Sequence, residues 1–246
     1  MKKIILTVLA AGMTTVSFCQ KSFILSHQDK RGFFAVSAGG SLPVGQFASN
    51  SPDDKGAGMA RRGVAFCLSG GVRLVGPVGL MVRAEQHRNG VQAQSLLIDG
   101  FSNGTVDAGN WSTTTFMGGP YVHLPIGRFS INTRLMAGQA QATMPTTSLM
   151  APAAETGTSV ETSGSKSTAL ALGGGLAVQY RLGRSISLQL AGDYTQSRFT
   201  FSGLTSTTWT NTGRAQSSFF TGDRTVGVVS ATAGIVILFG DCYRPF

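Results

Sequence analysis

Stretches in which apolar residues alternate with small or polar ones recur along the chain and predict β-strands. Alternation separates two sets of side chains, because successive residues of a strand point to opposite faces. No stretch beyond the N-terminus has the i, i+3, i+4 apolar spacing of an amphipathic helix. Eight strands are predicted, over residues 33–44, 63–74, 78–88, 113–126, 129–142, 168–182, 186–201 and 224–239.

The connections between the predicted strands alternate strictly between short and long. Three are tight turns with the Gly and Pro that such turns need, namely Val75-Gly76-Pro77, Gly127-Arg128 and Gly183-Arg184-Ser185. Four are long polar loops, at about 45–62, 89–112, 143–167 and 202–223. This alternation is typical of an up-and-down barrel in an outer membrane, where periplasmic turns are short and outer loops are long.

The two faces of these strands differ in a way that favours a membrane barrel over a soluble, lipocalin-like barrel. Within residues 168–182, one face carries Leu170, Leu172, Leu176 and Val178, and the other Ala169, Ala171, Gly173 and Ala177. A soluble barrel would need charged residues on its outer face. Small side chains suit the narrow interior of an eight-stranded barrel, and an uncharged apolar face suits lipid. The sequence thus predicts an all-β fold, an eight-stranded antiparallel up-and-down transmembrane β-barrel.

Composition narrows the functional classes. Only 13% of the 246 residues are charged, against about 25% in a typical soluble domain. The formal net charge is +9, but the basic residues are scattered and the only dense pair is Arg61-Arg62. An exported barrel does not meet nucleic acid, so we expect an anionic membrane surface, of outer-membrane lipid and lipopolysaccharide, to be the partner of this charge.

The N-terminus predicts export. A basic start at Met1-Lys2-Lys3, a short apolar run and small residues before the cleavage point form a signal peptide over residues 1–19. The alternative is a lipoprotein acylated at Cys19, against which Phe18 argues. The predicted organisation is then a short periplasmic segment over 20–32, an outer-membrane β-barrel over 33–239 and a C-terminal tail over 240–246, in a Gram-negative bacterium.

The last predicted strand carries a pattern of a polar residue, a Gly two positions later, and hydrophobic residues three and five positions after that, at Thr232, Gly234, Ile237 and Phe239. With the strand count and loop alternation, this strand resembles the small outer-membrane β-barrel proteins typified by OmpX and the barrel domain of OmpA, and the PorT-type barrels. The resemblance implies that the outer-membrane assembly machinery recognises this strand. Gly240 to Phe246 follow it, which departs from families that end on the strand's aromatic residue.

Four charged residues fall on the inward face at similar depths counted from the short turns, namely Arg83, Glu85, Arg134 and Asp193. Unpaired charges inside a narrow lumen would be costly, so they are expected to form a structural cluster of ion pairs that plugs the barrel. The alternative is a narrow channel gated by the same pairs. A structural or surface-interaction role, in a monomer presenting four outer loops, is the predicted function.

No catalytic, metal or cofactor site is predicted. A lipid-modifying enzyme would place His87 at the outer rim with Glu85 and with Ser95 or Ser112, but no nucleophile motif surrounds either serine. Cys67, predicted near the outer rim, and Cys242, on the periplasmic side, are expected to stay unpaired. Two interfacial aromatic girdles are also predicted, with Phe129, Tyr180 and Phe239 near the short turns, and Trp111, Phe116, Tyr194 and Phe199 near the long loops.

Overall fold

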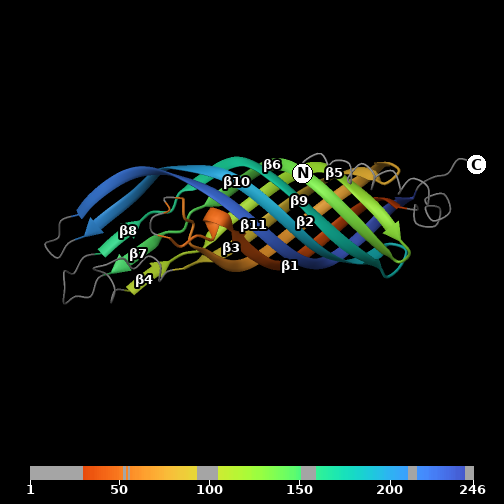
Figure 1. The fold of residues 1–246 in the computed structure, drawn as a ribbon, viewed down its shortest axis with the longest axis horizontal. Helices are drawn as coiled ribbons and strands as arrows, with labels where there is room; N and C mark the ends of the chain where they lie inside the picture. Colours follow the sequence, from red (N-terminus) through yellow and green to blue (C-terminus); the bar gives the residue numbers. More distant parts are fainter. Residues whose placement is uncertain are drawn as a thin grey trace, which may run out of the picture.

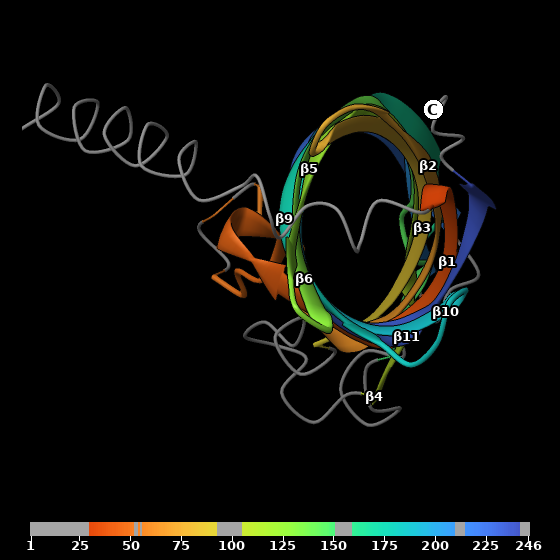
Figure 2. The same cartoon turned by 90° about the vertical axis from the view of Figure 1, so that its right-hand side faces the viewer.

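The protein is a closed β-barrel. The computed structural model describes residues 30–51, 54, 56–92, 105–150, 159–209 and 215–241. Within these residues, eight long strands follow one another around a ring (Figures 1 and 2). They are β1 (Lys30–Val44), β2 (Ala60–Val75), β3 (Val78–Val91), β5 (Trp111–Ile126), β6 (Phe129–Thr143), β9 (Lys166–Arg181), β10 (Ile186–Trp209) and β11 (Ala215–Asp241). The predicted all-β, eight-stranded antiparallel fold is confirmed.

The ring closes because the first strand pairs with the last. β1 and β11 are antiparallel from Lys30 opposite Asp241 to Val44 opposite Gly227. A closed ladder satisfies backbone N–H and C=O groups between strands, as a chain crossing lipid requires. Both terminal strands are longer than predicted, since β1 begins at Lys30 rather than residue 33 and β11 ends at Asp241 rather than residue 239.

Apolar side chains cover the outside of the ring, and small ones face inward. Leu135, Leu170 and Leu190 are each about two-thirds exposed, whereas Ala171 and Ala177 are buried. This burial follows the alternation seen in the sequence. Such an exterior is stable against lipid rather than water. No helix in the part of the chain that the structure describes is long and apolar enough to cross a membrane.

One predicted loop is largely strand. β10 and β11 stay paired from Ile186 opposite Ile237 to Trp209 opposite Ala215, so their hairpin projects beyond the other strands (Figure 1). The prediction of a loop over 202–223 was therefore wrong. Beyond the membrane neither face of the hairpin meets lipid, so the apolar alternation that marks a strand is absent there. Thr-rich sequence still favours extended backbone.

A bulge separates the membrane part of this hairpin from its extension. The pairing register shifts between Phe201 and Leu204, and Gly203 adopts a positive φ of 70°, which glycine tolerates at little cost. The extra residue on β10 reverses which face alternate residues occupy. Leu204 is consequently buried like Phe201, although their positions differ by an odd number.

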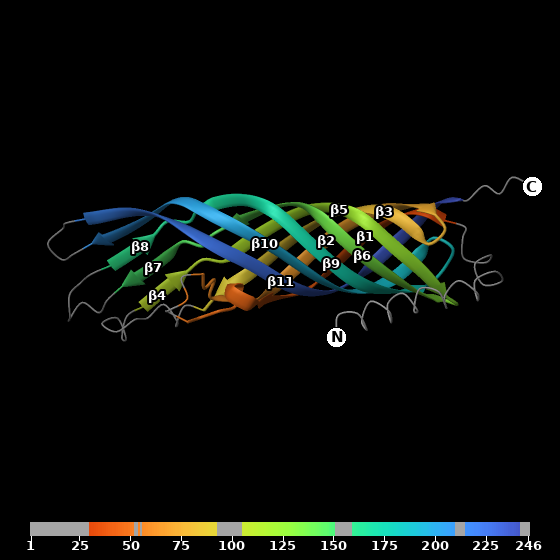
Figure 3. The ribbon, with the colours of Figure 1, turned by 45° about the horizontal axis from the view of Figure 1, so that its top comes forward.

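Two other predicted loops also contain short strands within their described residues. β4 (Thr105–Ala108) pairs with β7 (Thr147–Met150), β7 pairs with β8 (Ser159–Thr162), and β8 pairs with the extension of β10. These strands and the β10–β11 hairpin gather at one end of the molecule (Figure 3). The predicted loops at 89–112 and 143–167 were thus wrong in these parts. A 3₁₀ turn, η2 (Gly45–Phe47), lies in the first loop.

Candidate functional site

The structure brings the four inward charges predicted from sequence together inside the barrel. Arg83 and Glu85 lie on β3, Arg134 on β6 and Asp193 on β10. Arg83 Nε donates a hydrogen bond to Glu85 Oε1, and Arg83 Nη2 lies 2.7 Å from Asp193 Oδ2. No side chain of the four is more than 4% exposed. We call these four residues the lumen cluster.

Asp193 is the centre of the lumen cluster. Arg134 donates two hydrogen bonds to its carboxylate, at 2.6 and 2.7 Å, a bidentate arrangement that is among the strongest available to a carboxylate. β9 lies between β6 and β10, and its residue beside both partners is Gly175. A Cβ atom there would fall onto Asp193 Oδ1, so glycine is needed for Arg134 to reach Asp193 across the intervening strand.

Two further residues contact the lumen cluster. The sequence had predicted both of them at the outer rim instead. Arg83 Nη2 lies 3.2 Å from Cys67 Sγ, and His87 Nε2 lies 3.3 Å from Glu85 Oε2. Both Cys67 and His87 are 2% exposed. Placing them at the outer rim was wrong, because β2 and β3 extend farther toward the long loops than predicted. Their inward direction was already present in the alternation, since His87 shares the parity of Glu85.

Thr195 completes the surroundings of Glu85. Its hydroxyl donates to Glu85 Oε2 over 3.3 Å, so both carboxylate oxygens of Glu85 have partners. The carboxylates of Glu85 and Asp193 balance the charges of Arg83 and Arg134. No arrangement of three His, Cys, Asp or Glu side chains able to hold a metal ion occurs among the residues whose structure is described.

An aromatic layer fills the lumen on the long-loop side of the cluster. Phe47 packs edge-on against Trp111 with ring centroids 5.4 Å apart, and Trp111 lies 6.0 Å from Phe201. Phe199 and Phe201 are also in contact, at 5.9 Å, and all four rings are at most 2% exposed. Trp111 Nε1 donates to the carbonyl of Gly58, which ties the first loop to this layer.

The aromatic layer corrects part of the predicted girdles. Trp111 and Phe199 point into the lumen rather than toward lipid. Phe199 has the odd position that marks the inward face of β10, so the alternation contained the signal. Phe116 and Tyr194 do face outward, 63% and 43% exposed, and Phe129 and Phe239 face outward near the short turns.

The remaining sequence-predicted residues are spread over the barrel. In the proposed assembly strand, Thr232 is buried, and Ile237 and Phe239 are about half-exposed on the outer surface. Ser112 pairs with Arg88 and therefore lies on the opposite face of the sheet from His87, which pairs with Thr113. Ser95, Cys19 and Cys242 lie outside the described residues, as does the predicted signal peptide over residues 1–19. Cys67 is a free, buried thiol.

Comparison with known proteins identifies the fold. No protein-family model matches the chain, and no curated protein matches it. Among solved structures, the outer membrane protease OmpT from Escherichia coli is 10% identical with a TM-score of 0.50, over 89% of this chain and 100% of that one. Neisserial surface protein A is 11% identical, with a TM-score of 0.48 over 85% and 97%. The attachment invasion locus protein Ail of Yersinia pestis is 14% identical, with a TM-score of 0.44 over 85% and 99%.

These similarities concern the fold alone, because the identities are low. OmpT shares the barrel architecture with this chain over nearly the whole length of both. Together with an apolar exterior and a closed ring of eight strands, the likeness defines the class of the protein. The fold is the one found in bacterial outer-membrane β-barrel proteins, and the apolar exterior suits a membrane.

Proposed function

We propose that the protein is a plugged barrel with a structural or surface-interaction role, which presents its long-loop end to the outside of the cell. The observation that supports the proposal is a pair of buried side-chain layers across the lumen. The lumen cluster occupies its middle, and the aromatic layer lies between that cluster and the outer loops. Side chains alone are enough to fill the interior of an eight-stranded barrel.

The chemistry of the filling opposes conduction. An ion moving through the lumen would have to break ion pairs that are almost completely buried, which is costly unless new partners replace them. It would next meet the buried rings of Phe47, Trp111, Phe199 and Phe201, which offer an ion no compensation for its lost hydration. The gated-channel alternative therefore requires two unlike layers to open together.

The outer end supports an interaction role. The β10–β11 hairpin carries exposed aromatic side chains at its far end, where Trp209 is 48%, Phe219 77% and Phe220 41% exposed. Its strands reach beyond the other strands of the barrel, as Figures 1 and 3 show. Exposed aromatic side chains on a stiff hairpin are suited to contact with a partner surface. We propose the outer loops, including this hairpin, as the interaction surface.

The proposal extends to the surroundings of the barrel. It includes export by the signal peptide over residues 1–19, contact with outer-membrane lipid and lipopolysaccharide, and recognition of the strand from Thr232 to Phe239 by the assembly machinery. It includes a monomeric state and no catalytic activity. His87 is buried against Glu85, and Ser112 lies on the other face of the sheet, which leaves these residues without the geometry of a nucleophile and its base.

Wild-type protein in planar lipid bilayers is expected to show no steady ion conductance, because both lumen layers are filled. The variant Glu85→Gln should behave alike, since the aromatic layer is unchanged by it. Single-channel recording with each protein, beside a general porin as positive control, is the measurement. Regular conductance steps in the wild type that change in size with Glu85→Gln would contradict the plugged barrel and support the gated channel.

Shortening the β10–β11 hairpin is expected to remove a surface phenotype while leaving the barrel folded. The variant joins residues 201 and 222, which are paired across the hairpin, by a short turn. Cells expressing wild-type or shortened protein are compared for attachment to surfaces and for resistance to detergent. Loss of attachment with unchanged resistance supports the interaction role. Loss of resistance without change in attachment assigns the hairpin to envelope structure instead.

A further inference from the structure

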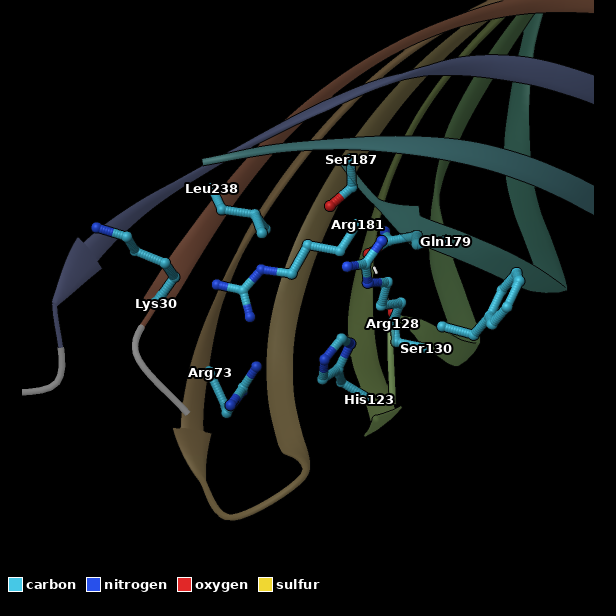
Figure 4. Close-up of a pocket in the computed structure, with 10 residues that line it drawn as sticks. Lys30, Arg73, His123, Arg128, Ser130, Gln179, Arg181, Ser187 and Leu238 are labelled. Atoms are coloured by element: carbon cyan, nitrogen blue, oxygen red, sulfur yellow. Dashed lines mark hydrogen bonds between the residues drawn. The ribbon is translucent and has the colours of Figure 1, made fainter. Parts of the chain in front are cut away.

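A cationic pocket opens at the short-turn end of the lumen. The basic side chains that line it are Lys30, Arg73, His123, Arg128 and Arg181, together with the polar side chains of Ser130, Gln179 and Ser187 (Figure 4). No Asp or Glu among the described residues lines it. Outer-membrane barrels turn their short connections toward the periplasm. We call this pocket the periplasmic rim pocket.

The barrel topology brings these basic groups together from distant parts of the sequence. Arg73 lies near the end of β2, His123 on β5, Arg128 in the β5–β6 turn and Arg181 at the end of β9. All these positions belong to the same rim, because antiparallel strands joined by short turns begin and end there. Figure 4 shows the side chains of Arg73, Arg181 and His123 extending around one space.

Neutral groups hold two of these side chains in place, and a third has a donor atom without a partner in the described part of the chain. Arg181 donates from Nε to the carbonyl of Gly183 at 3.1 Å and from Nη2 to that of Arg184 at 3.3 Å. His123 Nδ1 lies 2.6 Å from Asn132 Oδ1. The Nε atom of Arg73 is buried and has no hydrogen-bond partner within the described residues. Neutral oxygens therefore orient Arg181 and contact His123, and the guanidinium of Arg181 keeps its charge.

The lumen cluster shows how this barrel accommodates charged side chains that have a structural role. There, two arginines meet two carboxylates and all four groups are buried. At the rim, Arg73, Arg128 and Arg181 converge in a concavity that no Asp or Glu of the described residues lines, and such a concentration of positive charge attracts anions from solution. The Nε atom of Arg73 is also a hydrogen-bond donor without a partner among the described residues. This contrast indicates a ligand rather than a structural ion pair.

We propose that the periplasmic rim pocket binds a phosphate group. The planar donor forks of Arg73, Arg128 and Arg181 match the oxygens of phosphate, and His123 and Ser130 offer further polar contacts. The cavity, about 40 Å³, has space for roughly three water molecules, which suits one phosphate group with the rest of the molecule outside. The source of the phosphate is a soluble periplasmic ester or the headgroup of an anionic lipid.

The test measures binding of inorganic pyrophosphate by isothermal titration calorimetry, with the full chain in nanodiscs of zwitterionic phosphatidylcholine. Arg73→Gln/Arg181→Gln should weaken binding at least about tenfold, because two charged hydrogen-bond donors to the phosphate are lost. The matched control Arg61→Gln/Arg62→Gln removes the same charge from exposed positions near the other end of β2 and should change the affinity less than twofold. Arg128→Gln, at an exposed turn position, should weaken binding without risk to folding.

Nanodiscs containing phosphatidylglycerol distinguish the two sources. If the pocket takes a lipid headgroup, this lipid should weaken pyrophosphate binding to the wild type by competition. If it takes a soluble ester, the affinity should be the same in both nanodiscs. Absence of saturable binding, or equal weakening by the rim and control variants, would overturn the proposal.

Discussion

Replacing Asp193 by Ala is expected to lower the free energy of unfolding by about 3–5 kcal/mol, the usual effect of removing one partner from a buried ion pair. Asp193 accepts hydrogen bonds from both Arg83 and Arg134. Its loss leaves Arg134 without a carboxylate and Arg83 with Glu85 alone. Urea unfolding of the barrel in lipid bilayers measures the effect.

The matched control for this variant is Asp223→Ala, which breaks an exposed ion pair. Arg198 Nη2 lies 3.8 Å from Asp223 Oδ2, and the two side chains are 78% and 56% exposed. Such pairs contribute about 0–1 kcal/mol. Neutralising Arg134 in the Asp193→Ala background should restore part of the lost stability, because it removes the stranded cation. If the two Asp variants are equally stable, water solvates the cluster and the plug proposal fails.

Introducing a single methyl group at Gly175 is expected to destabilise the barrel by about 1–3 kcal/mol, as overpacking of a filled interior does. The new Cβ would fall onto the Asp193 carboxylate and lie 2.7 Å from the carbonyl oxygen of Gly192. Asp193 would have to move away from Arg134, so the ion pair and the packing are both disturbed. The same urea unfolding experiment measures the loss in Gly175→Ala.

Gly192→Ala is the control for that substitution, because a Cβ at Gly192 meets nothing within 4 Å. Its effect should stay within about 0.5 kcal/mol, as for most surface changes. A double variant, Gly175→Ala/Asp193→Ala, tests the mechanism. Coupling between the two sites should make its loss smaller than the sum of the single losses. Strict additivity would show that Gly175 does not serve the Arg134–Asp193 contact.

The sequence alone determined the eight strands, their short turns and the lipid-facing side of each. The reason is that a strand crossing a membrane has lipid on one face and a narrow lumen on the other, so its two sets of side chains must differ. Depth counted from the turns also placed Arg83, Glu85, Arg134 and Asp193 at one level. A charged side chain that points into a narrow lumen has few possible partners other than another inward charge. This made the cluster predictable.

The alternation of apolar and polar residues predicted strands only over the parts of the chain that span the membrane. Past that level both faces of a strand meet water or loops, so the β10–β11 extension and the short strands β4, β7 and β8 had no pattern to mark them. The positions of Cys67, His87 and Phe199 depended on how far each strand continues toward the outer loops. Their inward direction could be read from parity, but their depth could not.

Pairing between distant strands decided the rest. Arg83 meets Asp193 across 110 residues of sequence, and Arg134 reaches Asp193 only because Gly175 lies between them. The periplasmic rim pocket gathers Arg73, His123 and Arg181 from three strands whose sequences show no shared motif. Closure of the barrel fixes which strands are neighbours and at what register, and neither property is present in any single stretch of the chain.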